Sequence, residues 1–231
     1  EKYGVRRYGF HGTSHRYVSK RVCEFLGVQP EGKRIITCHI GNGGSISAIK
    51  DGKCMDTSMG LTPLEGLMMG TRCGDIDGGA ILYLMKKEGL TPDQMSDILN
   101  KKSGVLGIFK RSSDMRELED ASARGEELAK RTEAMYFYRI TKYIGAYAAA
   151  MGGVDVILFT GGVGENQATA RWGACETLGF LGVKLDPERN KVRSKEAIIS
   201  TDDSKVKVVV IPTDEELMIA TDTMDILNGK L

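Results

Sequence analysis

The stretch from 34 to 50, RIITCHIGNGGSISAIK, most constrains what this chain can fold into. It is typical of an apolar strand, a turn of Gly and Asn, and a second strand with alternating apolar positions. Asn42, Gly43 and Gly44 adopt positive φ at little cost, so we expect a tight turn with outward-facing amides. Such amides suit an anion, and phosphate is the obvious one, with His39 beside it. An isolated Gly-rich turn is more often a plain hairpin than an anion site. The choice between the two depends on whether other strands of this chain also end in polar, Gly-rich loops.

A second predicted strand leads into glycines. Residues 154–160, VDVILFT, form a continuous apolar run bounded by glycines, which is typical of a strand buried on both faces of a parallel sheet. We expect a turn at 161–166, GGVGEN, and then a helix from about 167 to 178. A strand, a Gly-rich turn and a helix N-terminus together bind phosphate or nucleotide in α/β proteins. The segment matches neither the P-loop nor G-x-G-x-x-G.

The remaining pattern indicates an α+β or α/β fold. Asp51-Gly52 predicts another hairpin turn before a strand at 53–57. Start and stop signals predict helices at about 15–26, 76–88, 91–102, 112 onward and 126–151, a strand at 205–211 and a last helix ending near 227. The expected N-caps are Thr13 or Ser14 for the first of these helices, and Thr91 and Thr213, each with a capping box, for two others.

Composition excludes several classes of function. The 231 residues carry a formal net charge of +1, so nucleic acid is not an expected partner. No apolar run approaches the roughly 20 residues of a membrane span, so no membrane is expected. Five cysteines without C-x-x-C spacing favour reduced thiols in the cytoplasm. The chain starts at Glu1 without a Met, so we expect it to be part of something longer.

Polar side chains near these loops have two interpretations each. His11 precedes a helix in FHGTSH, and it is either packed or catalytic. Arg72 in a Gly-bounded loop is either solvated or a charge clamp for phosphate. Asp114 and Arg116 are either a capped surface pair or part of a site. Glu215 either supports a helix dipole or holds Mg²⁺ through water. Three polar, Gly-rich loops each follow a strand or open a helix, and Arg, His and Glu lie beside them. Together they predict a nucleotide-phosphate site in an α/β domain.

Four motifs in the sequence resemble the acetate kinase family over the whole chain. They are FHGTSH at 10–15, HIGNGGS at 39–45, GLTPLEG at 60–66 with MGTR at 69–72, and FTGGVGEN at 159–166. The resemblance implies an α/β, ribonuclease H-like domain of the acetate and sugar kinase, chaperone and actin superfamily, with a mixed sheet and flanking helices. It implies that residues 1–231 are the C-terminal nucleotide-binding and dimerisation domain of a two-domain acyl kinase whose N-terminal domain is absent here.

The resemblance also implies roles for individual residues. His11 and Arg72 would stabilise the transferring phosphoryl group, and Glu215 would help to hold Mg²⁺, or Mn²⁺ in its place. The residues expected to bind ATP or ADP are His39, Ile40, Gly41, Asn42 and Gly43 on the phosphate side, and Asp114, Met115, Arg116, Gly162, Val163, Gly164, Glu165 and Asn166 on the nucleoside side.

The expected reaction is the reversible, Mg²⁺-dependent transfer of the ATP γ-phosphoryl group to acetate, which gives acetyl phosphate and ADP. The partners implied are nucleotide, a small carboxylate and a second copy in a homodimer. The family's catalytic Asp and acetate-binding Arg belong to the missing domain. We therefore expect this chain to bind nucleotide and turn over little. The alternatives are a propionate or butyrate kinase and a non-catalytic nucleotide-binding dimerisation module.

Overall fold

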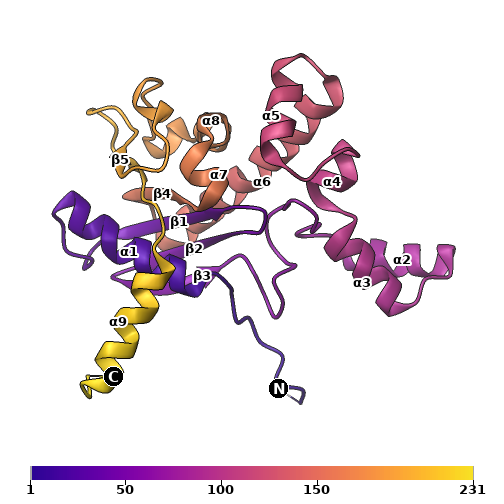
Figure 1. Ribbon diagram of the computed structural model, residues 1–231, viewed down its shortest axis with the longest axis horizontal. Helices are drawn as coiled ribbons and strands as arrows, with labels where there is room; N and C mark the ends of the chain where they lie inside the picture. The colour runs from indigo at the N-terminus through magenta and orange to yellow at the C-terminus, as the bar shows by residue number, and fades with distance from the viewer. Residues whose placement is uncertain (1, 231) are drawn as a thin grey trace.

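One mixed sheet of six strands organises the molecule, in the order β3-β2-β1-β4-β6-β5 (Figure 1). The structure is a computed structural model and describes residues 2–230. The strands are β1 (Arg34–Ile40), β2 (Gly44–Lys50), β3 (Lys53–Thr57), β4 (Val156–Thr160), β5 (Ala197–Ile198) and β6 (Lys207–Val210). The mixed sheet is the one that the sequence predicted.

Strands β1, β2 and β3 form the predicted antiparallel meander. β1 pairs with β2 from Arg34–Lys50 to Ile40–Gly44, and β2 pairs with β3. The second turn has positive φ at both Asp51 and Gly52, 54° and 71°. Two such residues in a two-residue loop match the right-handed twist of the flanking strands, which is why Asp-Gly predicts a hairpin here.

Strand β4 lies between β1 and β6 and is parallel to both. All five of its residues are buried, which confirms the prediction from its continuous apolar run. β4 has a hydrogen-bonded strand on each side and protein over both faces. Its side chains are therefore apolar up to Thr160. The short edge strand β5 is antiparallel to β6 and was not predicted, because two residues carry no periodic signal.

Nine α-helices and two short 3₁₀ helices connect or flank these strands within residues 2–230. They are α1 (Gly12–Leu26), α2 (Gly78–Glu88), α3 (Pro92–Lys101), α4 (Gly104–Phe109), α5 (Met115–Ala123), α6 (Glu127–Met151), α7 (Gly161–Asn166), α8 (Ala168–Cys175), α9 (Glu215–Leu227), the 3₁₀ helix η1 (Leu178–Leu181) and the 3₁₀ turn η2 (Arg189–Lys191). The capping box predicted at the start of α3 is present: Thr91 accepts from the backbone of Gln94, whose side chain accepts from the backbone of Thr91.

Three local predictions were wrong. Helix α1 is capped by neither Thr13 nor Ser14, because it begins one turn earlier at Gly12, after His11. Helix α9 is capped by Asp214, which accepts from the amide of Leu217, and not by Thr213. Residues 161–166 form the short helix α7 and not a turn, so the chain becomes helical directly at the end of β4.

The two faces of β1 and β2 differ in chemistry. On one face, which we call the apolar face, Ile36, Cys38, Ile46 and Ala48 pack in a large core with residues of α6. On the opposite face, which we call the polar face, the side chains include Thr37, His39, Ser45 and Ser47. Helix α1 packs against β1 on this second side. Ile35 and Ile49 also lie on this side and pack in a smaller core with α1, so the alternation of the strands separates an apolar face from one that mixes apolar and polar side chains.

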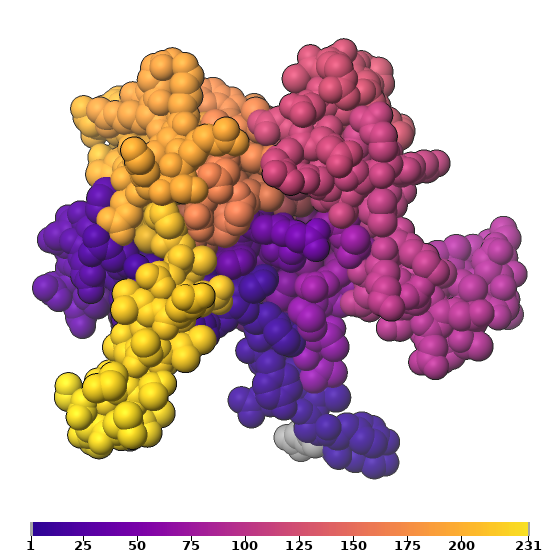
Figure 2. Space-filling model, in the orientation of Figure 1, coloured from indigo at the N-terminus to yellow at the C-terminus, as the bar shows by residue number. Residues whose placement is uncertain are grey.

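Several segments stand away from the sheet. Figure 2 shows α9, the N-terminal segment and the helices α2 and α3 as lobes that project from the body. Helix α2 has no buried residue, and its Leu82, Tyr83 and Leu84 side chains are exposed. Within residues 2–230, no helix combines the length and the apolar composition that crossing a bilayer requires.

Candidate nucleotide site

The turn between β1 and β2 is stabilised by its neighbours and not by left-handed residues. None of Asn42, Gly43 and Gly44 has positive φ, contrary to the sequence prediction. The amide of Gly41 donates to the carbonyl of Gly43 at 2.9 Å, so it does not belong to an outward row of amides. The carbonyl of Asn42 accepts from the amide of Gly70 at 2.9 Å, which ties the turn to the loop after β3.

Glycines in and beside this turn allow neighbouring side chains to approach its backbone closely. A Cβ added at Gly43 would lie 3.3 Å from Nη1 of Arg72 and 3.8 Å from Nε2 of His11. A Cβ at Gly70 would lie 2.1 Å from Oδ1 of Asn42. Side chains at these positions would therefore displace the groups that surround the turn. The structure brings His11, Arg72 and the turn together, as the predicted roles of the three require.

Three histidines, the full complement of the sequence, cluster on the polar face. The rings of His11 and His39 stack with centroids 4.1 Å apart, and His15 lies within 6.5 Å of both. Every ring is bonded to a hydroxyl: His11 Nδ1 to Ser45 at 2.9 Å, His39 Nδ1 to Ser14 at 2.8 Å, and His15 Nε2 to Ser45 at 2.7 Å.

The histidines are neutral near pH 7. Burial, with a smaller contribution from the neighbouring His39, lowers the pKa of His11 from 6.5 to about 4. Burial lowers the pKa of His15 to about 3 and also lowers the pKa of His39. A buried imidazole loses hydration mainly in its charged form, so the neutral form is favoured. Near this turn the histidines therefore act as hydrogen-bonding groups and not as cations.

The backbone of His11 is unusual. Its φ is 57° and its ψ 28°, a left-handed conformation in a residue that is not glycine. The carbonyl of His11 accepts from the amide of His15 at 2.9 Å, which closes the first turn of α1. Non-glycine residues with this conformation are uncommon and gather at functional sites.

Arg72 supplies the positive charge beside the turn. Its Nη1 donates to the carbonyl of Pro63 at 3.1 Å. Among the ion pairs of residues 2–230, none involves Arg72. A guanidinium without a carboxylate partner retains its charge for an anionic ligand.

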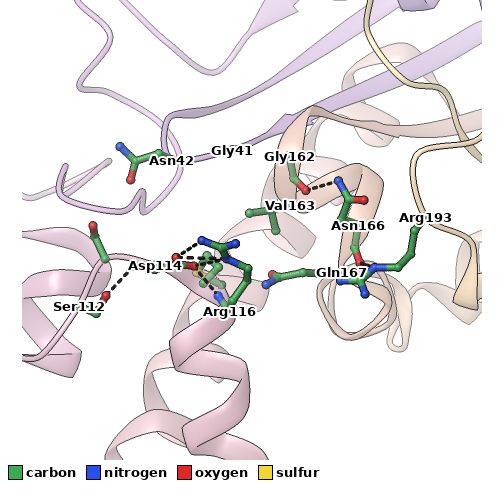
Figure 3. Close-up of a pocket in the computed structure, with 12 residues that line it drawn as sticks. Gly41, Asn42, Ser112, Asp114, Arg116, Gly162, Val163, Asn166, Gln167 and Arg193 are labelled. Carbon is green, nitrogen blue, oxygen red and sulfur yellow. Dashed lines mark hydrogen bonds and ion pairs between the residues drawn. The ribbon is translucent and has the colours of Figure 1, made fainter.

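A cavity of about 670 Å³ opens beyond the turn, between β1, α5 and α7 (Figure 3). This volume is within the range of small-molecule sites. Its lining residues come from four places in the sequence and are Gly41, Asn42, Ser112, Ser113, Asp114, Met115, Arg116, Gly162, Val163, Asn166, Gln167 and Arg193. The structure therefore brings together eight of the thirteen residues predicted to bind nucleotide.

The other five predicted residues lie outside the lining. Gly43 faces Arg72 and His11, and His39 stacks on His11, so these two lie on the side of the turn where the sequence predicts phosphate. Ile40 is 1% exposed and belongs to the core. Gly164 is buried too, where a Cβ would contact the carbonyl of Cys38 at 3.6 Å.

Glu165 has a structural position. Its Oε1 accepts from the amide of Gly161 at 2.9 Å and from the amide of Thr213 at 3.2 Å, and the hydroxyl of Thr160 lies 3.3 Å away. The carboxylate therefore joins the end of β4 to the segment that follows β6. It stabilises the base of the cavity and is not one of its lining residues.

On the opposite wall, Asp114 caps α5 and pairs with Arg116. Asp114 accepts from the amide of Arg116 at 2.8 Å, and its Oδ2 lies 2.6 Å from Nη2 of the same residue. The Arg116 guanidinium holds the pKa of Asp114 below its usual value. The structure shows the capped pair that was one interpretation of the sequence, and it places this pair on the wall of the cavity.

Sequence reasoning missed Arg193, which reaches the cavity from the charged segment between η2 and β5. Arg193 donates to the carbonyl of Asn166 at 3.1 Å. Its loop is fastened by buried Arg171, which donates to Oδ1 of Asn190 at 2.8 Å and to the carbonyl of Val192 at 2.9 Å. Burial lowers the pKa of Arg171 to about 10. A charged run gives no local signal that one distant arginine will anchor it.

Gln167, Ser112 and Ser113 also line the cavity and were not predicted. Gln167 follows the predicted glycine segment directly, and the two serines precede Asp114. The only feature of the sequence that pointed to them was that they stand next to predicted residues. For the two serines, a role in capping a helix explained their position equally well.

Glu215 is the first residue of α9 and is exposed. Its charge opposes the lowering of the His11 pKa, so it acts on the same site electrostatically. Within residues 2–230, no group of three or more His, Cys, Asp or Glu side chains is arranged so that it could hold a metal ion. Mg²⁺ usually keeps several waters and takes one or two carboxylates with substrate phosphates, so a single Glu is a compatible donor.

Known proteins resemble this chain closely. The model of the family described as "Acetokinase family" matches residues 1–221. The acetate kinase of Bacteroides fragilis is 77% identical over 228 residues, which cover 99% of this chain and 57% of that protein. The acetate kinase of Thermotoga maritima is 62% identical over 230 residues, covering 98% of this chain and 57% of that protein.

Solved structures give the same result. The acetate kinase of Porphyromonas gingivalis is 61% identical with a TM-score of 0.95, over 98% of this chain and 57% of that one. A propionate kinase from Francisella tularensis is 41% identical with a TM-score of 0.90, over 96% of this chain and 56% of that one. These likenesses confirm the predicted α/β fold of the acetate and sugar kinase and actin superfamily. The chain spans a little over half the length of these relatives.

Proposed function

The chain belongs to the acetokinase family, and from that premise we propose that it is the nucleotide-binding and dimerisation domain of an acetate kinase. The observation that carries the proposal is the cavity, where eight predicted nucleotide residues from three separate motifs meet. The nucleoside of ATP or ADP would occupy this cavity, and its phosphates would extend over the turn toward His11 and Arg72.

The groups beside the turn suit phosphoryl transfer. The γ-phosphoryl group passes to a carboxylate oxygen of acetate, which leaves ADP and gives acetyl phosphate. Charge spread over the transferred group is stabilised by fixed donors and cations. Arg72 supplies the cation, and neutral His11 supplies a hydrogen bond. Mg²⁺ would neutralise phosphate charge when bound, with Glu215 as the protein ligand through water.

The acyl side of the reaction belongs to the part of the relatives that this chain does not span. Direct transfer needs the carboxylate held within reach of the phosphoryl group. The chain would therefore bind nucleotide and turn over little on its own. A rate close to that of an intact acetate kinase in a hydroxamate-coupled assay would contradict this part of the proposal.

Propionate is a second candidate acceptor. The structural likeness to a propionate kinase at 41% identity favours it, because this part of the fold is shared by enzymes named for either acid. Comparing acetate and propionate turnover in a full-length protein that carries this chain would separate the two.

The exposed side chains Leu82, Tyr83 and Leu84 of α2 support a homodimer through this domain. Sedimentation of the chain as a monomer at micromolar concentration would contradict that assembly. The five free cysteines, of which Cys23, Cys38 and Cys175 are buried, support a cytoplasmic location.

Calorimetric titration with ADP and Mg²⁺ tests the nucleotide site. Asn42→Leu removes a polar side chain that lines the cavity, so we expect the affinity to fall by about tenfold, the equivalent of one lost hydrogen bond. Asn228→Leu, on the exposed end of α9, is the matched control and should bind like the parent chain. No heat with the parent would contradict the proposed site, and unchanged affinity in Asn42→Leu would remove the turn from it.

A further inference from the structure

A series of hydrogen bonds runs from the centre of the sheet to His11. The hydroxyl of Thr37 lies 2.7 Å from Nδ1 of His15, and Nε2 of His15 lies 2.7 Å from the hydroxyl of Ser45. The same Ser45 hydroxyl lies 2.9 Å from Nδ1 of His11. Thr37 and Ser45 are 0% exposed and His15 is 6% exposed. We call these four residues the hydroxyl–imidazole series.

A neutral imidazole carries one N–H, so the series has a direction. Each ring nitrogen either donates or accepts, and each hydroxyl has one hydrogen to donate. If Thr37 donates to His15, then His15 donates to Ser45, Ser45 donates to His11, and the hydrogen of His11 is on Nε2. If all the bonds reverse, His11 carries its hydrogen on Nδ1.

The buried end of the series selects the first direction. In the hydrogen bonds of residues 2–230, the Thr37 hydroxyl has His15 as its single partner. In the reversed direction Thr37 would accept from His15, and its own hydrogen would be buried without an acceptor. Leaving a buried donor unpaired costs about 1–3 kcal/mol. In the first direction every hydrogen of the buried residues has an acceptor, and the one hydrogen without a protein partner is that on Nε2 of the partly exposed His11.

The one competing acceptor is weaker. The carbonyl of Phe10 lies 3.4 Å from the Ser45 hydroxyl, compared with 2.9 Å for Nδ1 of His11. Hydroxyl hydrogen bonds are strongest near 2.7–2.8 Å, so Ser45 donates to the ring. Protonation of both nitrogens of His15 is disfavoured because burial lowers its pKa to about 3.

We propose that Thr37, His15 and Ser45 are positioning residues that hold His11 as the Nε2–H tautomer, with that N–H directed to the turn beside Arg72. The geometry on the other side of the ring fits. Nε2 of His11 has no partner among the hydrogen bonds of residues 2–230, and it lies 3.8 Å from the place of a Cβ on Gly43.

The consequence of the tautomer rests on the proposed function. A phosphoryl oxygen accepts hydrogen bonds and carries charge, so it is stabilised by an N–H and repelled by a ring lone pair. Neutral His11 in the reversed tautomer would offer the lone pair. His15 thus acts on the reaction through His11 without touching the nucleotide.

The direct test is ¹⁵N NMR of the 231-residue chain labelled on histidine, at pH 7.5 without nucleotide. The sequence has three histidines, so three pairs of ring nitrogens appear. We expect His11 and His15 each to show a protonated Nε2 and an unprotonated Nδ1. A protonated Nδ1 and a bare Nε2 on His11 would overturn the proposal, and this measurement needs no variant.

Variants at position 15 test the cause. In His15→Met the donor to Ser45 is lost, so Ser45 becomes free to accept from His11, and the two ring nitrogens of His11 should move toward averaged shifts. In His15→Gln the side-chain amide supplies an N–H again, and the original pattern should return. His39 is bonded to Ser14 outside the series, so its signals are the internal control. Unchanged His11 signals in folded His15→Met would overturn the role of His15.

The outcome is independent of the nucleotide titration. If ADP fails to bind while His11 has the expected tautomer, the proposed function fails and the series stands. If ADP binds and His11 has the opposite tautomer, the proposed function stands and the series is refuted. Circular dichroism at 222 nm confirms that each variant is folded before its spectrum is interpreted.

Discussion

The two faces of β1 and β2 are both buried, yet they contribute different things to the molecule. On the apolar face, Ile36, Cys38 and Ile46 are 0% exposed and pack under α6. On the polar face, Thr37 and Ser45 are equally buried, and their polar atoms are occupied by hydrogen bonds to histidines. Neighbouring residues of one strand thus enter a hydrophobic core and a polar network.

The apolar face contributes mainly to the free energy of folding, whereas the hydrogen bonds of the polar face mainly fix the geometry of its side chains. Burying apolar surface stabilises the fold by about 25 cal/mol per Å². A buried hydrogen bond adds only about 1 kcal/mol net, because its partners give up water. A fully satisfied network does fix the position and tautomer of each member. The apolar face therefore supplies stability, and the polar face supplies the orientation of His11.

The largest effect is expected for His11→Ala in a full-length protein that carries this chain. Losing one donor to the transferring phosphoryl group should lower kcat by about 10²–10³-fold, as in other enzymes with such donors. The melting temperature should change far less than in the core variant below, because His11 is only half-buried. His11→Gln, which can still donate, is the matched variant and should lose less. Equal kcat for His11→Ala and the parent would remove His11 from the reaction.

A smaller but global effect is expected for Ile46→Ala on the apolar face. Ile46 is fully buried, so the lost contacts and the cavity should lower the free energy of unfolding by about 2–5 kcal/mol. Urea denaturation measures it. Ile226→Ala, at an exposed position of α9, is the matched control and should change stability by less than about 0.5 kcal/mol. If Ile46→Ala reduced ADP affinity in the folded chain without reducing stability, the division between the faces would be wrong.

The smallest effect, measured per pH unit, is the pH dependence of the free energy of unfolding that the histidines of the polar face cause. The folded pKa of His15 is about 3 and its unfolded value 6.5, so the unfolded chain binds the extra proton between these values. Stability is complete above about pH 6.5 and is lost as the pH falls toward 3, by about 1.4 kcal/mol per pH unit for this histidine. His11, with a folded pKa of about 4, adds a second loss of the same sign.

Urea denaturation of the parent chain and of His15→Gln between pH 7.5 and 5 measures this slope. The variant should show the shallower dependence, because only His11 and His39 then remain to resist protonation. Identical slopes in both chains would mean that His15 is not buried in its neutral form.

Much of this arrangement could be predicted from the sequence. Alternation in 34–50, the Asp51-Gly52 turn and the continuous apolar run before Thr160 are local patterns, and each predicted its strand correctly. The long GGVGEN and HIGNGG motifs predicted that the ends of β1 and β4 meet a nucleotide, and residues from both line the cavity. Local patterns succeed where backbone period and turn chemistry decide the structure.

The failures share a cause, which is contact with residues far away in the sequence. Positive φ was predicted for Asn42, Gly43 and Gly44, and in the structure Gly43 instead allows the close approach of Arg72 and His11. Glycines at 161–164 predicted a turn, and the interaction of Glu165 with Gly161 and Thr213 accompanies a helix there. Arg193 was missed because Arg171 fastens its loop.

The sequence by itself determined most of the strands and helices, the family, and most of the residues around the cavity, because these depend on local pattern and on motifs. Only the tertiary structure decided which face of the hairpin carries the chemistry. It buried His15 between Thr37 and Ser45, which lie eight residues apart in the sequence and on neighbouring strands, 22 and 30 residues from His15. Burial made the imidazoles neutral, and the hydroxyls gave them a direction, since neither property exists before the sheet and α1 pack together.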